Sequence, residues 1–156
     1  MPTLLHVDSS LIEQKGTDTF MKIATLIARI LLGLLFLVMG LNGFLHFIPM
    51  PPPTGLAGQY FTVMFVSHYM VLVFLLQVIG GALLLANRFV PLALILLGPI
   101  LVNILLFHSL MAPAGLPLAL LATVLWGIVF YGVRRAFAGV FVQRVQTEAE
   151  KRLASD

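Results

Sequence analysis

The stretch ARILLGLLFLVMGLNGFLHFIPM, Ala28–Met50, decides the fold, since its one formally charged side chain is the arginine next to its start. The pattern continues along the chain, because residues 30–133 contain a single Lys, Arg, Asp or Glu, which is Arg88. A soluble domain has about a quarter of its residues charged, whereas a charge at the centre of a bilayer costs about 2.5–3.5 kcal/mol. The sequence therefore predicts an integral membrane protein.

The composition agrees with this class and excludes others. Hydrophobic residues make up 60% of the 156 positions, and the mean hydropathy is +1.07. The sequence pI is about 9.7, but the basic residues flank apolar segments, which indicates attraction to lipid headgroups and no nucleic-acid partner. Because the chain has no cysteine, thiol–disulfide exchange, cysteine-ligated zinc and iron–sulfur clusters are excluded.

Four apolar segments approach or exceed the length of about 20 residues that a helix needs to cross the hydrocarbon layer. Prolines within residues 49–53 and 113–117, and a tight turn at residues 86–89, separate these segments. The more polar segment Leu56–Ser67 suits a short interfacial helix or a re-entrant turn before the second span. We therefore expect an all-α, integral membrane four-helix bundle with spans at Ile23–Ile48, Tyr69–Ala86, Val90–Leu110 and Leu118–Val133.

The distribution of charge sets the expected orientation. All nine Lys and Arg residues fall on one side of a four-span topology, and the two loops on the other side have no charge. The positive-inside rule then places both termini in the cytoplasm. We expect the chain to lie in the inner membrane of a cell as a multi-pass protein. Residues 1–21 are expected to form a flexible N-terminal tail, residues 22–135 the transmembrane domain and residues 136–156 a cytoplasmic amphipathic tail.

Uncharged polar residues inside the spans are the candidates for ligand binding. Asn42 and Asn103 both lie about 20 Å from the cytoplasmic ends of their helices, and Gln77 lies near the midplane. Asn42 and His46 are four residues apart and share a helix face, whereas His108 is about 140° from Asn103 around its helix. We therefore expect Asn42, His46 and Asn103, together with Gln77, to form a polar cluster in the outer half of the bundle.

Two interpretations remain open for each of these residues. The amides serve either as hydrogen-bonding groups between helices, which gain about 0.6 kcal/mol on average, or as contacts to a ligand. The histidines serve either as polar aromatic anchors at the membrane interface or as ligand-binding groups. Their diverging faces disfavour a three-histidine metal site or a bis-histidine haem. The candidate ligand-binding set, with no catalytic residue and no metal site predicted, is Asn42, His46, Gln77, Asn103 and His108.

Small residues in the first two spans indicate close helix packing. Gly33, Gly40 and Gly43 share one stripe of the first span with Arg29, and such a stripe lets a neighbouring helix approach closely. The pair Gly80-Gly81 is expected to have the same effect in the second span.

Three groups of residues in the first three spans form a recognisable pattern. They are Arg29-Ile30-Leu31-Leu32-Gly33 with Gly40-Leu41-Asn42-Gly43, then Gln77-Val78-Ile79-Gly80-Gly81-Ala82-Leu83-Leu84-Leu85, and then Pro91-Leu92-Ala93-Leu94 with Pro99 and Asn103. With this pattern, over about residues 22–141, the chain resembles the DoxX family of small bacterial and archaeal membrane proteins. Members commonly have Glu at the position of Gln77, so this chain lacks a charge that they have. The resemblance implies a four-helix membrane bundle that is similar, in some members, to a subunit of thiosulfate–quinone oxidoreductase, while other members assemble with redox-stress enzymes.

The sequence leaves two main hypotheses for function. The first is a non-catalytic membrane subunit or scaffold of an oxidoreductase-type complex, with quinone as a ligand that the amide donors could contact. The alternative is a small membrane protein that binds or transports an apolar solute or lipid. A stand-alone enzyme is disfavoured, since the spans offer no carboxylate or thiol as acid, base or nucleophile. The expected partners are the lipid bilayer and a membrane or redox protein, and no cofactor is required.

Overall fold

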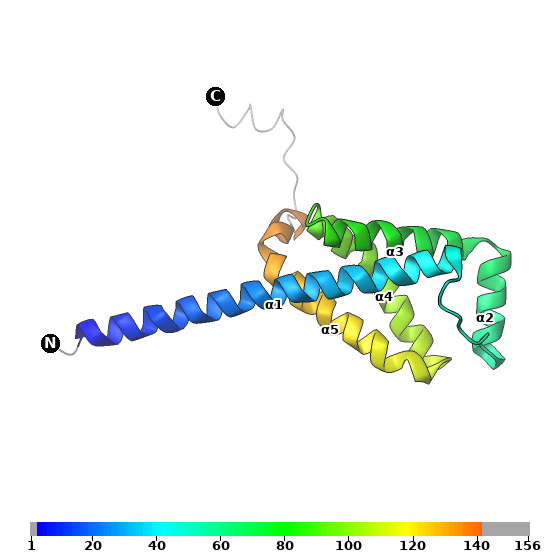
Figure 1. The fold of residues 1–156 in the computed structure, drawn as a ribbon, viewed down its shortest axis with the longest axis horizontal. Helices are drawn as coiled ribbons and strands as arrows, with labels where there is room; N and C mark the ends of the chain where they lie inside the picture. Colours follow the sequence, from blue (N-terminus) through cyan, green and yellow to red (C-terminus); the bar gives the residue numbers. More distant parts are fainter. Residues whose placement is uncertain (1–2, 142–156) are drawn as a thin grey trace, which may run out of the picture.

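The computed structural model describes residues 3–141, with side chains described for residues 14–139. Within that range every regular element is a helix, which confirms the all-α prediction. Figure 1 shows the elements in the order α1 (Thr3–Leu45), α2 (Gly55–Val66), α3 (Tyr69–Leu85), α4 (Val90–Leu110), the short 3₁₀ helix η1 (Pro113–Gly115), α5 (Leu116–Val133) and the 3₁₀ helix η2 (Arg134–Phe141).

Three helical segments are long and apolar enough to cross a membrane, namely Gln14–Leu45, Val90–Leu110 and Pro113–Gly139. Helices α2 and α3 pass the same test only together, and they are bent by 87° relative to each other. The break falls at His68, whose backbone is in the left-handed region with φ of 60°. The chain therefore has three helices able to span a membrane, or four if the bent pair forms one span, which identifies it as multi-pass by length and composition.

Helix α1 differs from the expected first span at both ends. It begins at Thr3, well before Ile23, since residues 3–22 contain no proline and only one glycine to oppose the helix. It ends at Leu45, before the expected Ile48, because His46 takes a left-handed backbone conformation with φ of 52°. The part of the predicted C-terminal tail from residue 142 onward lies outside the described residues.

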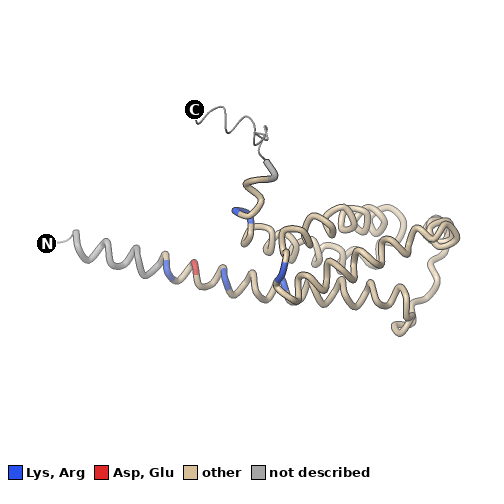
Figure 2. The backbone as a smooth tube through the Cα atoms, turned by 90° about the horizontal axis from the view of Figure 1, so that it is seen from above, with Lys and Arg blue, Asp and Glu red and all other residues tan. Residues whose placement is uncertain are grey.

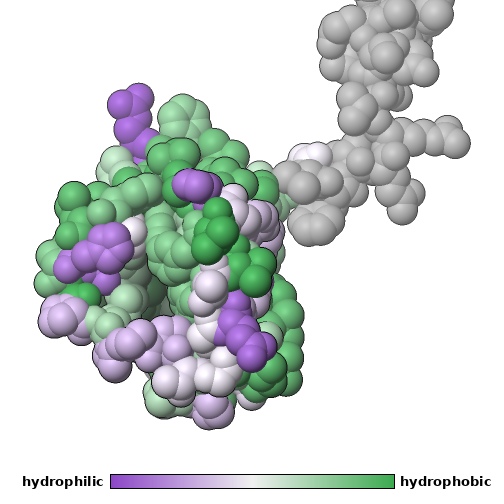
Figure 3. Space-filling model, turned by 90° about the vertical axis from the view of Figure 1, so that its right-hand side faces the viewer, coloured by the Kyte–Doolittle hydropathy of each residue, from purple (hydrophilic) through white to green (hydrophobic). Residues whose placement is uncertain are grey.

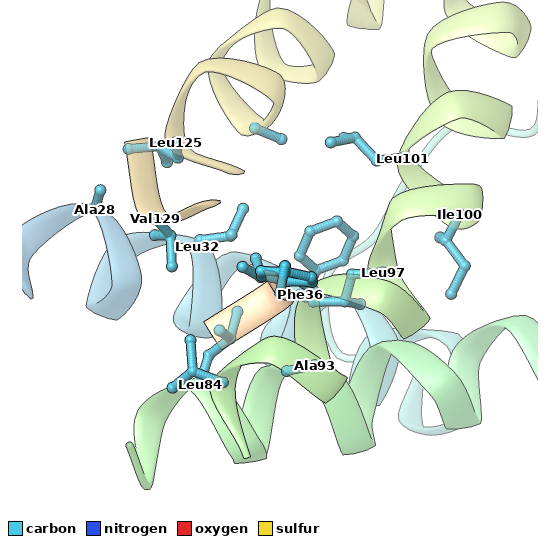
Figure 4. Packing of buried hydrophobic residues seen from close by; sticks show 14 residues of the cluster. Ala28, Leu32, Phe36, Leu84, Ala93, Leu97, Ile100, Leu101, Leu125 and Val129 are labelled. Carbon is cyan, nitrogen blue, oxygen red and sulfur yellow. The ribbon is translucent and has the colours of Figure 1, made fainter. Parts of the chain in front are cut away.

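Four long helices surround the core. Helix α1 packs against α3 and α5, and α4 also packs against α3 and α5, so each of the four contacts two others. Large side chains from all four helices meet in the centre, and those with essentially no exposure include Leu32, Phe36, Leu84, Leu97 and Val129. Figure 4 shows these labelled side chains pointing toward one another from separate helices.

Helices α1 and α3 approach each other closely, as the glycine stripe predicts. A Cβ atom added at Gly81 of α3 would lie 2.6 Å from the Leu37 backbone nitrogen and 2.8 Å from the Gly33 carbonyl oxygen of α1. At Gly40 of α1, an added Cβ would lie 2.9 Å from the Val78 backbone nitrogen. Backbone atoms cannot rotate out of the way as side-chain ends can, so these glycines are what permits the observed helix spacing.

Charge divides the molecule into two unlike ends. Residues 14–139 contain six Lys and Arg residues and a single acidic residue, Asp18. Figure 2 shows the basic residues along the N-terminal half of α1 and at the adjoining end of the helix assembly, with none at the end where α2 lies. We call the end marked by Lys22, Arg88, Arg134 and Arg135 the basic end. Figure 3 looks onto the opposite end, where hydrophilic patches interrupt an apolar surface.

Candidate functional site

Asn42 is buried and holds the chain where α1 ends. Its side chain is 3% exposed, the Oδ1 atom accepts a hydrogen bond of 2.6 Å from the Ile48 backbone N–H, and Nδ2 donates to the Ile48 carbonyl oxygen at 3.3 Å. The side chain thus pairs with both backbone groups of one residue, as a neighbouring strand would. This clamp starts the loop toward α2 and occupies polar groups that were expected to meet a ligand.

His46 does not share a face with Asn42, because the helix that would align them has already ended. Its backbone N–H still donates to the Asn42 carbonyl oxygen at 2.9 Å, but its left-handed backbone turns the chain away and the side chain is exposed. The four-residue spacing predicts a shared face only within a continuous helix, and that assumption fails here.

Gln77 lies in the interface between α1 and α3. Its side chain is 7% exposed, and its Cβ atom faces Gly40. Within the described side chains no hydrogen bond forms to its amide group. The amide therefore contributes no cross-helix hydrogen bond, and small-residue packing holds the two helices at this level.

Asn103 lies on the exposed face of α4 and is paired with α2. The Tyr60 hydroxyl donates to the Asn103 Oδ1 atom at 3.2 Å, while the Tyr60 ring lies 5.5 Å from the Phe107 ring, centroid to centroid. Phe61 adds an edge-on contact to Phe107 at 5.1 Å. A pocket of about 80 Å³ opens beside this group, lined by Tyr60, Asn103, Leu106, Phe107, Leu110 and Met111.

His108 stabilises the turn that follows α4. Its Nδ1 atom lies 3.0 Å from the Ala112 carbonyl oxygen, and its ring covers Gly115 so closely that a side chain there would collide with it. The ring also stacks edge-on against Phe107 at 5.1 Å. His108 therefore adjoins the Tyr60–Asn103 pair through Phe107, although the helix periodicity separates it from Asn103.

The five predicted residues are consequently not gathered at one site. No side-chain hydrogen bond within residues 14–139 joins any two of them. Only Asn103 and His108 belong to one neighbourhood, the aromatic group around Phe107, and only Asn103 lines the pocket there. A ligand site built from Asn42, His46 and Asn103 together is not what the side chains form, whereas a role for Asn103 in ligand binding stays a prediction.

Arg29 is a buried polar residue that sequence reasoning did not single out. Its side chain is 9% exposed, and Nη1 donates to the Leu84 carbonyl oxygen at 2.7 Å. Leu84 is in the last turn of α3, where the helix dipole presents partial negative charge, so the guanidinium is attracted to this position. The signal in the sequence was the position of Arg29 on the glycine stripe, since that stripe faces α3.

No group of three or more His, Asp or Glu side chains that could bind a metal ion is found among the described residues. Comparisons with family models, with curated proteins and with solved structures each return no match for this chain. Among the predicted site residues Asn103 is the strongest candidate, because with Tyr60, which was not predicted, it combines exposed polar atoms, aromatic rings and a pocket.

Proposed function

We propose that the protein is a DoxX-like membrane protein that crosses the inner membrane four times, with both termini in the cytoplasm. Two observations support this topology. The bent pair α2–α3 is apolar enough to count as a span, and the basic residues gather at one end of the helices. The resemblance of the glycine and amide pattern in the first three spans supports the family. A four-helix bundle accounts for the way in which α1, α3, α4 and α5 each contact two others.

Within that membrane frame, we propose a non-catalytic subunit or scaffold of an oxidoreductase-type complex that contacts quinone at the Tyr60–Asn103 pair. The observation that carries this proposal is an amide–hydroxyl pair among aromatic rings on the exposed face of α4. Asn103 accepts the Tyr60 hydroxyl proton at Oδ1, so both Nδ2 hydrogens remain free as donors. Quinone carbonyl oxygens need such donors, and the adjoining rings offer stacking surface.

The pocket volume limits how the ligand enters. A cavity of about 150 Å³ holds one benzene molecule, so the 80 Å³ beside Asn103 takes the edge of a quinone ring and leaves the rest in lipid. Such an edge-on contact is suited to an exchangeable quinone from the membrane pool. The isoprenoid tail would extend into the surrounding bilayer without a protein channel.

The test is equilibrium binding of decylubiquinone to the protein purified in detergent. Asn103→Leu is expected to weaken binding about fivefold to tenfold, which corresponds to the loss of one hydrogen bond. Tyr60→Phe should weaken it less, because the hydroxyl orients Asn103 and need not touch the ligand. Thr62→Val is the matched control on α2, since the Thr62 hydroxyl donates to the Gly58 carbonyl oxygen of its own helix at 2.8 Å. Undetectable binding to the unaltered protein, or equal weakening by Thr62→Val, would exclude this quinone contact.

A further inference from the structure

Helix α2 lies at the end of the assembly opposite the basic end and buries little of its surface there. Figure 1 shows it running across the direction of α1 and α3. Ala57 is the one buried residue among the twelve of α2, whereas Leu56, Val63 and Val66 are each exposed by 68–75%. A helix that buries so little gains little stability from tertiary packing, so its contacts can open locally while the rest of the fold stays intact.

A small group of contacts holds α2 against α4. The bond of 3.2 Å from the Tyr60 hydroxyl to Asn103 Oδ1 is the only hydrogen bond from α2 to another helix within residues 14–139. The rings of Tyr60 and Phe61 lie 5.5 Å and 5.1 Å from the Phe107 ring, centroid to centroid. We call this bond and these two ring contacts the α2–α4 contact. One movement of α2 away from α4 would release all three interactions together.

Each end of α2 has a residue with a left-handed backbone. Gly55 begins the helix with φ of 62°, and residues 46–54 before it have no regular secondary structure. At the other end His68 has φ of 60° and separates α2 from α3 by the bend of 87°. Beside this bend the rings of Phe65 and Phe74 lie 6.0 Å apart. A rotation about His68 would therefore release the α2–α4 contact and keep α2 attached to α3.

The observed position of α2 carries backbone strain at His68. A residue other than glycine is disfavoured in the left-handed region, because its Cβ atom crowds a carbonyl oxygen. A swing of α2 that returns His68 to a common backbone region removes this strain but breaks the α2–α4 contact. The strain therefore favours opening and the contact favours closure, which is the arrangement expected of an element with two positions.

We propose that α2 is a lid that turns about Gly55 and His68, and that its closed position retains quinone at Asn103. Tyr60 on the lid and Asn103 on α4 both line the pocket of about 80 Å³, so a molecule held there touches both sides of the α2–α4 contact. Such a molecule binds the closed position better than the open one and shifts the lid toward closure. The retention of quinone rests on the proposed function, whereas the movement of α2 does not.

The movement is tested by the rate of cysteine labelling, since the chain has no cysteine of its own. The detergent-purified full chain with Ala57→Cys is treated with N-ethylmaleimide, and this thiol becomes reactive only when the lid uncovers it, because Ala57 is 3% exposed. Gln59→Cys, on the exposed face of α2, gives the rate of an uncovered thiol, and Ala93→Cys, at a core position with 0% exposure, gives the rate that requires unfolding. We expect an intermediate rate for Ala57→Cys, and a rate equal to either reference would overturn the lid.

Further variants, each combined with Ala57→Cys, test what holds the lid and where it turns. Tyr60→Phe should accelerate labelling about fivefold by removing one hydrogen bond, whereas Thr62→Val should not, because the Thr62 hydroxyl bonds within α2. His68→Val should also accelerate labelling, since a β-branched residue is disfavoured in the left-handed region, and His68→Asn, which is tolerated there, should leave the rate nearly unchanged. An unchanged rate in Tyr60→Phe, or equal rates in His68→Val and His68→Asn, would overturn the proposal.

Decylubiquinone separates the role of the lid from the quinone contact itself. At ten times its Kd it should slow labelling of Ala57→Cys about tenfold, and Asn103→Leu should abolish this effect at the same concentration. Quinone that binds without slowing the labelling would overturn retention by the lid. Undetectable quinone binding would instead exclude the proposed function, and the labelling rates measured without quinone would still decide whether α2 moves.

Discussion

At the scale of single residues, two asparagines that look equivalent in the sequence have opposite surroundings. Asn42 is 3% exposed, and its side chain both donates a hydrogen bond to the Ile48 backbone and accepts one from it. Asn103 is exposed, and it accepts a hydrogen bond from Tyr60 while its amide hydrogens have no partner within residues 14–139. A buried amide that bonds the backbone stabilises the fold, and an exposed amide beside aromatic rings is available to a ligand. The same substitution should therefore have different effects at the two positions.

Asn42→Leu is expected to destabilise the protein by roughly 1–3 kcal/mol, because it removes both hydrogen bonds between the Asn42 side chain and the Ile48 backbone. Hydrogen–deuterium exchange should rise in the loop at residues 46–54, and the thermal unfolding midpoint in detergent should fall. Asn103→Leu is the matched control, and it should leave both measurements nearly unchanged. A stable Asn42→Leu protein with an unaltered loop would contradict the role of Asn42 as a clamp.

At the scale of elements, the α1–α3 interface determines how the helices assemble. Gly81 lies under backbone atoms of Leu37 and Gly33, so this contact has no flexible side chain that could yield. Arg29 and Asn42 fix the two ends of the same interface, one at the last turn of α3 and the other at the loop that leads to α2. Apolar transfer does not drive helices together in lipid, so close packing and such polar bonds have to provide the attraction.

Gly81→Ala is therefore expected to destabilise the protein by about 1–3 kcal/mol, since α1 and α3 must move apart to admit one methyl group. Gly127→Ala on α5 is the control, because nothing lies within 4 Å of the position of its Cβ. A helix gains about 0.5–1 kcal/mol when a glycine is replaced by alanine, so the control should be neutral or slightly stabilised. Thermal unfolding in one detergent compares the two variants, and equal midpoints would contradict the packing argument.

Sequence periodicity predicted the helices better than it predicted the site. The bounds of α4 agree with the expected span at Val90–Leu110, since a tight turn before it and prolines after it leave no alternative. The prediction that Asn42 and His46 share a helix face was wrong, because the left-handed backbone of His46 ends α1 three residues before Pro49, the first residue that could not continue it. The pairing of Tyr60 with Asn103 joins two segments far apart in sequence, and it depends on the 87° bend between α2 and α3, which the sequence did not specify.

At the scale of the whole molecule, the position of the basic residues and the bend between α2 and α3 together determine how the chain crosses the membrane. If the bent pair crosses as one span, Lys22, Arg88 and Arg135 all lie on the same side. If the pair instead returned to the side it came from, Arg88 and Arg135 would lie opposite Lys22, which the positive-inside rule and the bond between Arg29 and the end of α3 at Leu84 both oppose. The two topologies thus differ in the side reached by every residue after the bend.

Reporter fusions distinguish these topologies, because the two topologies place Pro113 and Arg135 on opposite sides of the membrane. Four spans predict that a reporter after Thr54 and one after Pro113 lie outside the cytoplasm, and that one after Arg135 lies inside. Three spans with a re-entrant α2–α3 pair also place Thr54 outside, but they place Pro113 inside and Arg135 outside. Fusions of alkaline phosphatase, which is active outside, and of green fluorescent protein, which is fluorescent inside, should give opposite signals at each site. A cytoplasmic signal after Thr54 would show that the orientation is the reverse of the one proposed. With Thr54 outside, a cytoplasmic signal after Pro113 would show that the chain has three spans.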